Sequence, residues 1–318
     1  WYARRMSTQP ATFSTLPLET ISSALKTGSL NLDYGACTVK LTAGGTQFED
    51  SLKIVYRAFR FIVNEPFSDF HVCLHPGSVI RQLFRPTTHF TIDGIQPFDP
   101  FPLSDALPMY EWGVNWCFAQ RFNQYVLLHA GTLAWGDRAV IMAATPGSGK
   151  STLSAALMLR GFRLLSDEFG VLDPETGLLL PMLKPVALKN RSIDVIRSFS
   201  DDAWLGPTFK ATRKGDVAHL APDEASVSAV RQPAKPALVI FPKYEAGAEL
   251  SLKPQAPEHA FTRLAFNSFN YALLGPISFA AVANVAASCP AYELRYSCLE
   301  DAVRCLHDLL LEFSSTNA

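Results

Sequence analysis

The sequence predicts an α/β fold, with a phosphate-binding domain over residues 106–318 and a strand-rich accessory region over residues 1–105. Two observations carry this prediction. A glycine-rich stretch at residues 144–151 stands between an apolar run and a helical pattern. Before residue 105 the chain is a series of short β-branched and aromatic runs that proline and glycine interrupt.

The accessory region is predicted to contain strands over residues 37–42, 70–75 and 89–92. Residues 56–63 are compatible with a strand or a short helix, because their periodicity favours neither. A proline-rich connection then leads to a predicted helix over residues 107–123. The aromatic side chains of this helix are expected to pack in the core; they are Trp112, Trp116, Phe118 and Phe122.

His129 follows a third apolar run, at the point where a predicted strand over 126–132 gives way to small residues. A lone histidine in this setting is usually part of the core or of a turn. A catalytic role for it depends on the motifs that come later in the chain.

The glycine-rich stretch reads Ala-Thr-Pro-Gly-Ser-Gly-Lys-Ser, with alanine at the first position where the usual pattern has glycine. It follows the apolar run 139–143 and precedes the helical pattern 153–160. In such loops backbone N–H groups face a polyphosphate, a lysine adds charge, a hydroxyl binds Mg²⁺ and the helix N-terminus contributes partial charge. We assign nucleotide binding to Pro146, Gly147, Ser148, Gly149, Lys150, Ser151 and Thr152.

Two adjacent carboxylates, Asp167 and Glu168, begin seventeen residues after Lys150. They end a short apolar run, which predicts a buried strand with both acids at its end. A carboxylate beside a phosphate loop can hold Mg²⁺ or accept the proton of an attacking hydroxyl. We assign Mg²⁺ to Ser151 and Glu168 and the role of base to Asp167, with an exchange of roles between the two acids as the alternative.

Further along, a strand is predicted over residues 237–241, ending at Pro242. Helices are predicted over residues 189–198, 257–269, 276–287 and 300–313. Arg213 and Lys214 lie in a polar loop that either reaches a phosphoryl group or is simply solvated. Asn267 and Asn270 are expected on a helix surface or in packing.

Together, the three motifs resemble the catalytic domain of HPr kinase/phosphorylase. That family has a strand ending in histidine, then a phosphate loop, then a strand ending in an acidic pair, matched here by His129, residues 145–151 and Asp167–Glu168. Five further segments are similar to the HPr-kinase-related kinases of the A type; they are residues 111–116, 186–190, 213–219, 241–244 and 267–271.

The resemblance implies a P-loop kinase domain of the HPr kinase/phosphoenolpyruvate carboxykinase-like type. It implies an enzyme that uses ATP and Mg²⁺ to phosphorylate a serine hydroxyl on a small protein or peptide, with catalytic roles for Asp167 and for a nearby His129. Two other classes of function remain open. One is a P-loop small-molecule kinase or carboxykinase-like enzyme, and the other is a non-catalytic nucleotide-sensing interaction protein.

The chain departs from the family in two places. The family's acidic pair is Asp-Asp, whereas this chain has Asp167 and Glu168. The family also carries an arginine- and glycine-rich loop after the acids, linked to its phosphorolysis activity, and residues 181–186 read Pro-Met-Leu-Lys-Pro-Val instead. We therefore expect a kinase without the reverse phosphorolysis.

Composition excludes several partner classes. The 318 residues carry a net charge of −1 with no block of lysine or arginine, so no nucleic-acid footprint is expected. No apolar run is long enough to span a bilayer. Six cysteines without a C-x-x-C pair are expected to be reduced thiols of a cytoplasmic protein. The sequence is also compatible with a homo-oligomer. The first methionine, Met6, is expected to be the natural start of the chain, after residues 1–5.

Overall fold

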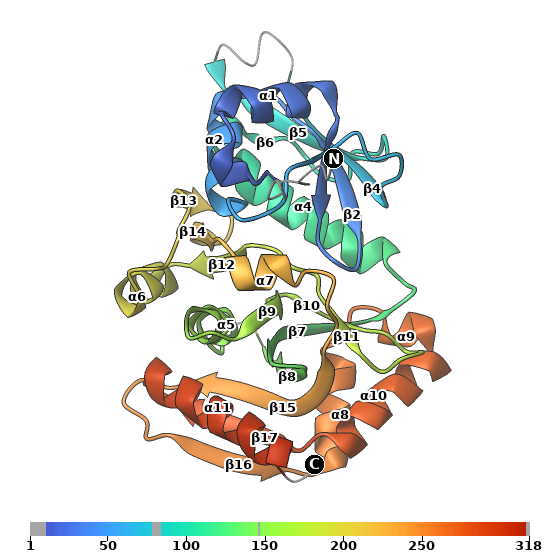
Figure 1. The fold of residues 1–318 in the computed structure, drawn as a ribbon, viewed down its shortest axis with the longest axis vertical. Coiled ribbons are helices and arrows are strands. Elements are labelled where there is room, and N and C mark those ends of the chain that lie inside the picture. The colour runs from blue at the N-terminus through green and yellow to red at the C-terminus, as the bar shows by residue number, and fades with distance from the viewer. Residues whose placement is uncertain (1–10, 78–83, 146, 316–318) are drawn as a thin grey trace, which may run out of the picture.

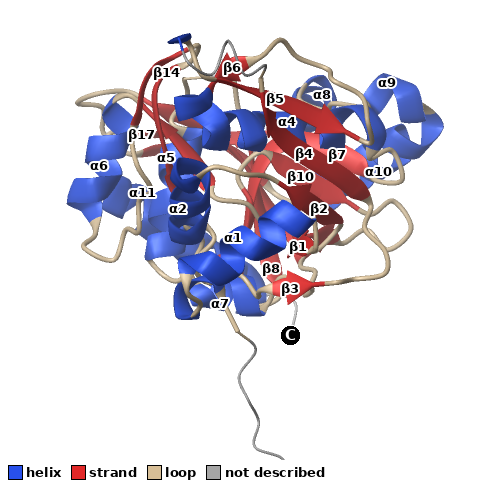
Figure 2. Ribbon diagram, turned by 90° about the horizontal axis from the view of Figure 1, so that it is seen from above, coloured by secondary structure: helices blue, strands red, loops and turns tan. Residues whose placement is uncertain are grey.

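The structure, a computed structural model, describes residues 11–77, 84–145 and 147–315. Its strands form three sheets, with helices packed against their faces (Figures 1 and 2). This arrangement confirms the predicted α/β class. Pro146, assigned to the phosphate loop, lies outside the described residues, as does the start of the chain around Met6.

The first sheet has six strands in the order β3-β1-β2-β4-β5-β6. The strands expected over residues 37–42, 70–75 and 89–92 are present as β2, β4 and β5, and the ambiguous stretch 56–63 is a turn followed by β3. The bounds are β1 Leu30–Asp33, β2 Thr38–Thr42, β3 Ile62–Val63, β4 Phe70–Pro76, β5 Thr87–Ile92 and β6 Phe101–Pro102. Burial alternates along β2 and β5, as the two-residue period of a half-buried strand requires.

Three helices accompany this sheet. Helices α1 (Leu18–Thr27) and α4 (Ala106–Arg121) contact its strands, and α2 (Thr46–Val55) contacts both of these helices. The sequence predicted α4 but neither α1 nor α2. Each of these two is only ten residues long, and α1 buries three apolar side chains, so their periodic signal is short. Two single-turn 3₁₀ helices, Phe13–Thr15 and Leu103–Asp105, complete this part of the chain.

The largest sheet holds eight strands in the order β11-β10-β7-β8-β15-β17-β16, with β9 paired to β7. Strands β8, β15 and β17 run parallel, so their carboxyl ends meet at one edge. The bounds are β7 Val126–Trp135, β8 Arg138–Ala143, β9 Arg163–Ser166, β10 Phe169–Leu172, β11 Leu179–Leu180, β15 Lys235–Tyr244, β16 Ser251–Gln255 and β17 Ala291–Tyr296.

Two predicted strand ends were wrong. The strand predicted over residues 126–132 continues three residues further, as β7, to Trp135. Its small residues lie close to α5, since a Cβ at Gly131 would be 2.7 Å from Oγ of Ser154. Strand β15 continues through Pro242, which pairs with Leu294. The pairing of β15 with β8 stops at Ile240. Beyond that point the strand does not pair with β8, so Pro242, which has no N–H, is tolerated there.

A small sheet, β12-β14-β13, lies beside the helix that follows the phosphate loop, α5 (Lys150–Leu159). Its strands are β12 Val186–Lys189, β13 Phe209–Thr212 and β14 Gly215–Leu220. The helix predicted over residues 189–198 begins two residues later, so Lys189 belongs to β12. The other helices are α6 Arg191–Phe199, α7 Glu224–Ser228, α8 Pro257–Phe266, α9 Tyr271–Leu274, α10 Pro276–Ser288 and α11 Leu299–Ser315. None of the helices in the described ranges is long and apolar enough to cross a membrane.

One apolar core runs through both halves of the chain. A single cluster of buried side chains extends from Phe13 to Leu310 and includes α4, which lies between the first sheet and the largest one (Figure 1). The ring of Phe118 on α4 packs edge-on against Phe169 on β10, with ring centroids 6.0 Å apart. Helix α4 is thus packed directly against a strand that adjoins the candidate site.

Candidate functional site

The phosphate loop leaves the carboxyl end of β8 and enters α5 at Lys150. Gly147 and Gly149 have φ of +86° and +91°, the left-handed region that glycine adopts without steric cost. A Cβ at position 149 would lie 2.6 Å from Oη of Tyr296 and 2.9 Å from Cβ of Tyr244. Position 149 therefore requires glycine for both its backbone angle and its space.

Two tyrosines at the ends of neighbouring parallel strands hold the loop. The N–H of Tyr244 donates to the carbonyl of Ser148 over 2.9 Å, and Oη of Tyr296 donates to the carbonyl of Gly149 over 3.3 Å. Burial raises the pKa of Tyr296, which favours its protonated, donating form. Tyr244 belongs to the family-like segment 241–244, but no contact of either tyrosine with the loop was predicted, because only the parallel pairing of β8, β15 and β17 brings them to it.

Lys150 links the loop to the acidic pair. Its ammonium donates to the backbone carbonyl of Asp167 and lies 3.4 Å from that residue's Oδ1. Both side chains are over nine-tenths buried. The structure thus brings together the two motifs on which the sequence prediction depends.

The loop residues fit a bound phosphate. The Oγ of Ser148 is buried and has no hydrogen-bond partner among the described residues. Ser151 and Thr152 are half-buried in the first turn of α5, where unpaired N–H groups favour an anion. These groups and the cation of Lys150, which in this structure contacts Asp167, are the kinds of donor that a phosphate needs.

The acidic pair occupies the tight turn between β9 and β10, as the sequence predicted. Oγ of Ser166 accepts a 3.0 Å hydrogen bond from the N–H of Phe169 and so closes the turn. The two acids then face different partners. Asp167 faces Lys150, whereas the side chain of Glu168 is 40% exposed and faces His129.

His129 lies opposite Phe169 in the antiparallel pairing of β7 and β10. This register places its Nε2 3.4 Å from Oε1 of Glu168. The sequence predicted His129 beside Asp167, and the geometry gives it the neighbouring acid instead. A one-residue difference in register is enough to change the partner, and the spacing of motifs along the chain does not fix it.

The electrostatic surroundings distinguish the two acids. Burial alone would raise the pKa of Glu168, but the hydrogen bond from His129 and the charges of Lys150 and Lys189 outweigh it and lower the pKa to about 2. Glu168 is therefore an ionised carboxylate across the physiological range. That state suits a cation ligand, and a group with so low a pKa is a poor proton acceptor near neutral pH.

The segment after α8 supports the strand that carries His129. Asn270 is buried; its Oδ1 accepts from the N–H of Leu127, and its amide donates to the carbonyl of Tyr125 over 2.9 Å. The ring of Phe269 lies against those of His129 and Phe169, with centroids 5.2 and 4.7 Å away. Asn270 thus satisfies strand backbone, which agrees with the packing role expected for it.

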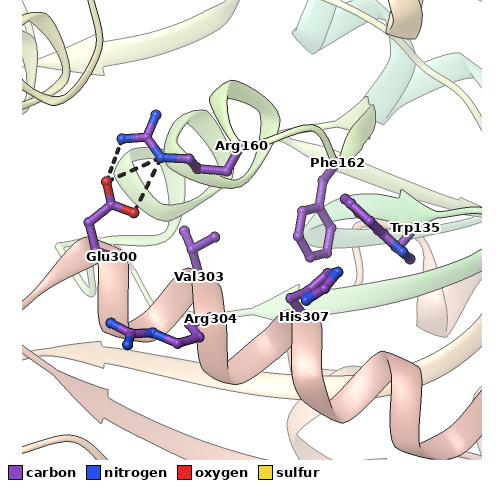
Figure 3. Close-up of a pocket in the computed structure, with 7 residues that line it drawn as sticks. All are labelled: Trp135, Arg160, Phe162, Glu300, Val303, Arg304 and His307. Carbon is purple, nitrogen blue, oxygen red and sulfur yellow. Dashed lines mark hydrogen bonds and ion pairs between the residues drawn. The ribbon is translucent and has the colours of Figure 1, made fainter.

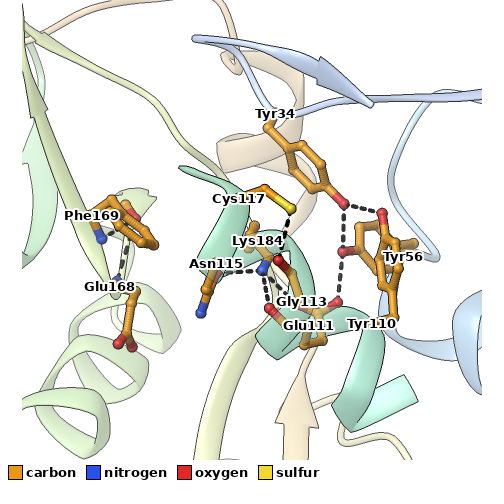
Figure 4. A network of polar contacts seen from close by, with 11 residues as sticks. Tyr34, Tyr56, Tyr110, Glu111, Gly113, Asn115, Cys117, Glu168, Phe169 and Lys184 are labelled. Atoms are coloured by element: carbon orange, nitrogen blue, oxygen red, sulfur yellow. Dashed lines mark hydrogen bonds and ion pairs between the residues drawn. The ribbon is translucent and has the colours of Figure 1, made fainter. Parts of the chain in front are cut away.

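A buried polar network ties the segment after β11 to the N-terminal region (Figure 4). The ammonium of Lys184 lies 3.0 Å from Oε2 of Glu111 and donates to Oδ1 of Asn115 over 2.6 Å. Glu111 also accepts a 2.7 Å hydrogen bond from Tyr56, which continues through Tyr34 to a third hydroxyl, that of Tyr110. Lys184 is the one charged residue in the stretch 181–186, and it is held in the interior.

Arg213 and Lys214, left open by the sequence, occupy the turn between β13 and β14. The guanidinium of Arg213 lies 4.8 Å from the ring centroid of Phe101, and the ammonium of Lys214 lies 4.8 Å from that of Trp112. Both cations therefore rest on aromatic rings of the N-terminal half. Trp112 packs in the core as predicted, but it also supports a cation.

A surface groove of roughly 480 Å³ lies elsewhere, between the end of α5 and α11 (Figure 3). Its lining contains no residue of the phosphate loop or the acidic pair. Its two arginines are already paired, Arg160 with Glu300 and Arg304 with Asp301. The groove therefore lacks the groups of the candidate site.

Comparison with known proteins gives little further guidance. No family model matches the chain, and no curated protein matches it. Among solved structures, the HPr(Ser) kinase/phosphatase from Coxiella burnetii is similar at 14% sequence identity, over 58% of this chain and 98% of that one, with a TM-score of 0.27. Likeness at this TM-score does not establish a shared fold or activity.

Proposed function

We propose that this chain is an ATP-dependent kinase that transfers a phosphoryl group to a serine hydroxyl of a small protein or peptide. The observation that carries the proposal is the contact between Lys150 and Asp167. It sets a carboxylate beside the cation of a phosphate loop. Phosphoryl transfer needs that combination of charge neutralisation and an acceptor for the hydroxyl proton.

Each residue of the site then has a distinct role. Gly149 and Lys150, with the first turn of α5, hold the phosphates. Bound ATP supplies the γ-phosphoryl group, which the serine oxygen receives as the bond to the β–γ bridging oxygen breaks and ADP leaves. Asp167 accepts the proton of the serine hydroxyl. His129 fixes the carboxylate of Glu168 through their 3.4 Å contact and so acts as a positioning residue.

Mg²⁺ in such sites usually binds one or two protein oxygens together with phosphate oxygens and water. Ser151 and Glu168 are the oxygen ligands that we assign to it. The low pKa of Glu168 supports this assignment. The role of base is assigned to Asp167, which contacts Lys150 of the phosphate loop. Within the described ranges no three His, Cys, Asp or Glu side chains converge as a metal cluster.

We also propose that transfer runs in one direction. Reverse phosphorolysis would need inorganic phosphate to reach a phosphoserine, and the segment 181–186 has its one cation, Lys184, bonded to α4 in the interior. The enzyme is therefore expected to release no pyrophosphate when it is incubated with phosphorylated product, Mg²⁺ and excess inorganic phosphate. Robust pyrophosphate release, followed by ³¹P NMR, would overturn this part of the proposal.

The proposal is tested with ATP labelled at the γ-phosphate, Mg²⁺ and an array of serine-containing peptides. Label is expected on serine, and only with an intact Lys150 and Asp167. Replacing the labelled serine by alanine should abolish the signal at that peptide. Binding of ATP without label on any peptide or on a subsequently identified protein acceptor would favour the nucleotide-sensing alternative.

A further inference from the structure

The segment between α8 and α9 lies beside β7 at the point where β8 has ended. The pairing of β7 with β8 stops at Ala143, where the phosphate loop begins. Beyond it the N–H of His129 donates to the carbonyl of Asn267, and the N–H of Phe269 donates to the carbonyl of Leu127 over 2.8 Å. The segment is therefore fixed along the part of β7 that carries His129.

This segment places an exposed aromatic ring directly beside the groups of the candidate site. The ring centroid of Phe269 lies 5.2 Å from that of His129, whose Nε2 is 3.4 Å from Oε1 of Glu168. Phe269 is 41% exposed, and the side chains of His129 and Glu168 are 29% and 40% exposed. Packing against Phe169, with centroids 4.7 Å apart, keeps the Phe269 ring in place. A molecule that approaches Glu168 therefore meets an apolar ring.

Further apolar side chains are exposed on the same part of the chain. Helices α8, α9 and α10 pack together at one side of the molecule, next to β7 (Figures 1 and 2). The ring of Phe261 on α8 joins the other two helices, with centroids 6.3 Å from Tyr271 and 5.3 Å from Phe279. Five exposed side chains of these helices and of the segment between them are here called the apolar surface; they are Phe266, Phe269, Leu273, Ile277 and Phe279.

The apolar surface belongs to an uncharged stretch of the chain. No Asp, Glu, Lys or Arg stands between Arg263 and Glu293, and these two are paired with each other over 3.5 Å. Single exposed apolar side chains are common on proteins, whereas a cluster of them marks a binding surface. Without charges of its own, the stretch selects neither acidic nor basic partners. It fits an uncharged, apolar segment.

The position of the surface indicates which partner it serves. A second copy of the chain or a lipid layer that covered Phe269 permanently would also cover His129, and it would block the approach to Glu168. The partner that has to approach these groups is the acceptor of the phosphoryl group.

We propose that the acceptor docks on the apolar surface, with an apolar side chain next to its serine packed against Phe269. Further apolar side chains of the acceptor then lie along α9 and the first turn of α10. The inference rests on the proposed kinase function and narrows its substrate class to peptides or proteins whose serine is flanked by apolar, uncharged residues. Such anchoring delivers the hydroxyl to the site in a fixed orientation.

The probes are two short fluorescein-labelled peptides with a central serine. One has leucines on both sides of the serine, and the other has aspartate and lysine at the same positions. Fluorescence anisotropy measures their binding to enzyme loaded with a non-hydrolysable ATP analogue and Mg²⁺. Wild type should bind the leucine peptide at least about tenfold more tightly than the charged one, the scale expected for burying an apolar side chain.

Three variants and a control test the residues of the surface. Phe269→Ala should weaken binding of the leucine peptide about tenfold, and Phe269→Leu, which keeps an apolar side chain, should stay within about threefold of wild type. Leu273→Asp should also weaken it, and because Leu273 is 70% exposed this variant keeps the test decisive even if Phe269→Ala does not fold. Phe67→Ala removes a ring that is 73% exposed in the loop between β3 and β4, and it should change nothing.

Several outcomes would overturn the inference. Equal affinity for the two peptides would contradict it, as would binding of the leucine peptide that Phe269→Ala and Leu273→Asp both retain. Self-association in sedimentation that Leu273→Asp abolishes would assign the surface to a second copy of the chain. Cosedimentation with phosphatidylcholine vesicles that the same variant abolishes would assign it to lipid.

The same peptides separate this inference from the proposed function. Asp167→Asn should bind the leucine peptide as wild type does, because docking does not involve the base. Selective binding by wild type without phosphoryl transfer from ATP to the peptide would support the docking surface and contradict the kinase alone. Equal transfer to the leucine and the charged peptide would support the kinase and overturn the docking surface.

Discussion

The ammonium of Lys150 contacts both the backbone carbonyl and the carboxylate of Asp167, so the phosphate loop and the acidic turn form one buried unit. Covalently they are seventeen residues apart, joined through α5 and β9. A substitution in the phosphate loop is therefore expected to alter the position of the acidic turn, and the reverse. This contact links nucleotide binding to the proposed base.

Lys150→Ala should weaken binding of a non-hydrolysable ATP analogue by about 10- to 100-fold, because hydrogen bonds to charged groups contribute about 1.5–3 kcal/mol. Calorimetric titration in Mg²⁺ measures the loss. Lys253→Ala is the control, since it removes one positive charge from an exposed strand position. Equal affinities for Lys150→Ala and wild type would contradict the assignment of the phosphate loop.

Gly149→Ala should reduce both stability and nucleotide affinity. The added Cβ would lie 2.6 Å from Oη of Tyr296, so the loop or the tyrosine must move. Gly136→Ala is a matched control, with φ of +63° and nothing within 4 Å of the added Cβ. It should lower the unfolding free energy only by the cost of a left-handed backbone for alanine, about 1–2 kcal/mol.

Urea unfolding of the two alanine variants gives the stability difference, and calorimetry gives the affinity. Gly149→Ala should be the less stable variant, and it alone should lose affinity for the ATP analogue. Tyr296→Phe in the Gly149→Ala background removes the closer of the two contacts and should restore part of the stability. Equal losses of unfolding free energy in Gly149→Ala and Gly136→Ala would show that the contact with Tyr296 does not exclude a side chain at position 149.

The buried pair of Lys184 and Glu111 should behave as a coupled unit. Lys184→Met leaves the carboxylate buried without its cation and should cost about 3–5 kcal/mol of unfolding free energy. Adding Glu111→Gln removes the second charge and keeps an acceptor for Tyr56, so the double variant should be more stable than the sum of the single effects predicts. A double-mutant cycle in urea that gives additive effects would contradict this coupling.

Ionised Glu168 should make the folding stability of the protein depend on pH in the acidic range. Its pKa is about 2 in the folded chain and about 4.3 in an unfolded one, so the unfolded state binds the proton first as the pH falls. The contribution to stability is fully present above about pH 4.3 and is lost as the pH falls towards 2. Because the side chain is 40% exposed, solvent screening makes this contribution modest.

The measurement is the pH dependence of urea unfolding for wild type and Glu168→Gln. The stability of wild type should fall more steeply between about pH 4.3 and 2 than that of the variant, which has no carboxyl to protonate at this position. Parallel curves would show that the contact with His129 does not hold the carboxylate in its ionised form.

The parts of the site that could be predicted are those fixed by local sequence. Glycines at positions 147 and 149, followed by Lys150, specify a strand–loop–helix unit by their own backbone preferences. The turn at Asp167 and Glu168 is closed by the adjacent Ser166. Such features depend on neighbouring residues, so they are visible in a single sequence.

The parts that were missed depend on pairing between distant segments. Tyr244 and Tyr296 reach the loop only because β15 and β17 run parallel to β8. Lys184 meets Glu111 across 73 residues, and the partner of His129 is set by the register of β7 and β10. Neither composition nor periodicity determines which strands become neighbours. The contacts of Tyr244, Tyr296 and His129 all depend on that strand pairing.

The central claim is that Asp167 accepts the proton of the hydroxyl that receives the phosphoryl group. Single-turnover transfer from ATP, to the serine peptide or protein that the labelling screen identifies, tests it most directly. Asp167→Asn should bind the ATP analogue but transfer phosphate at least about a hundredfold more slowly, the usual scale for loss of a general base. Full rate in Asp167→Asn together with an inactive Glu168→Gln would contradict the account and exchange the roles of the two acids.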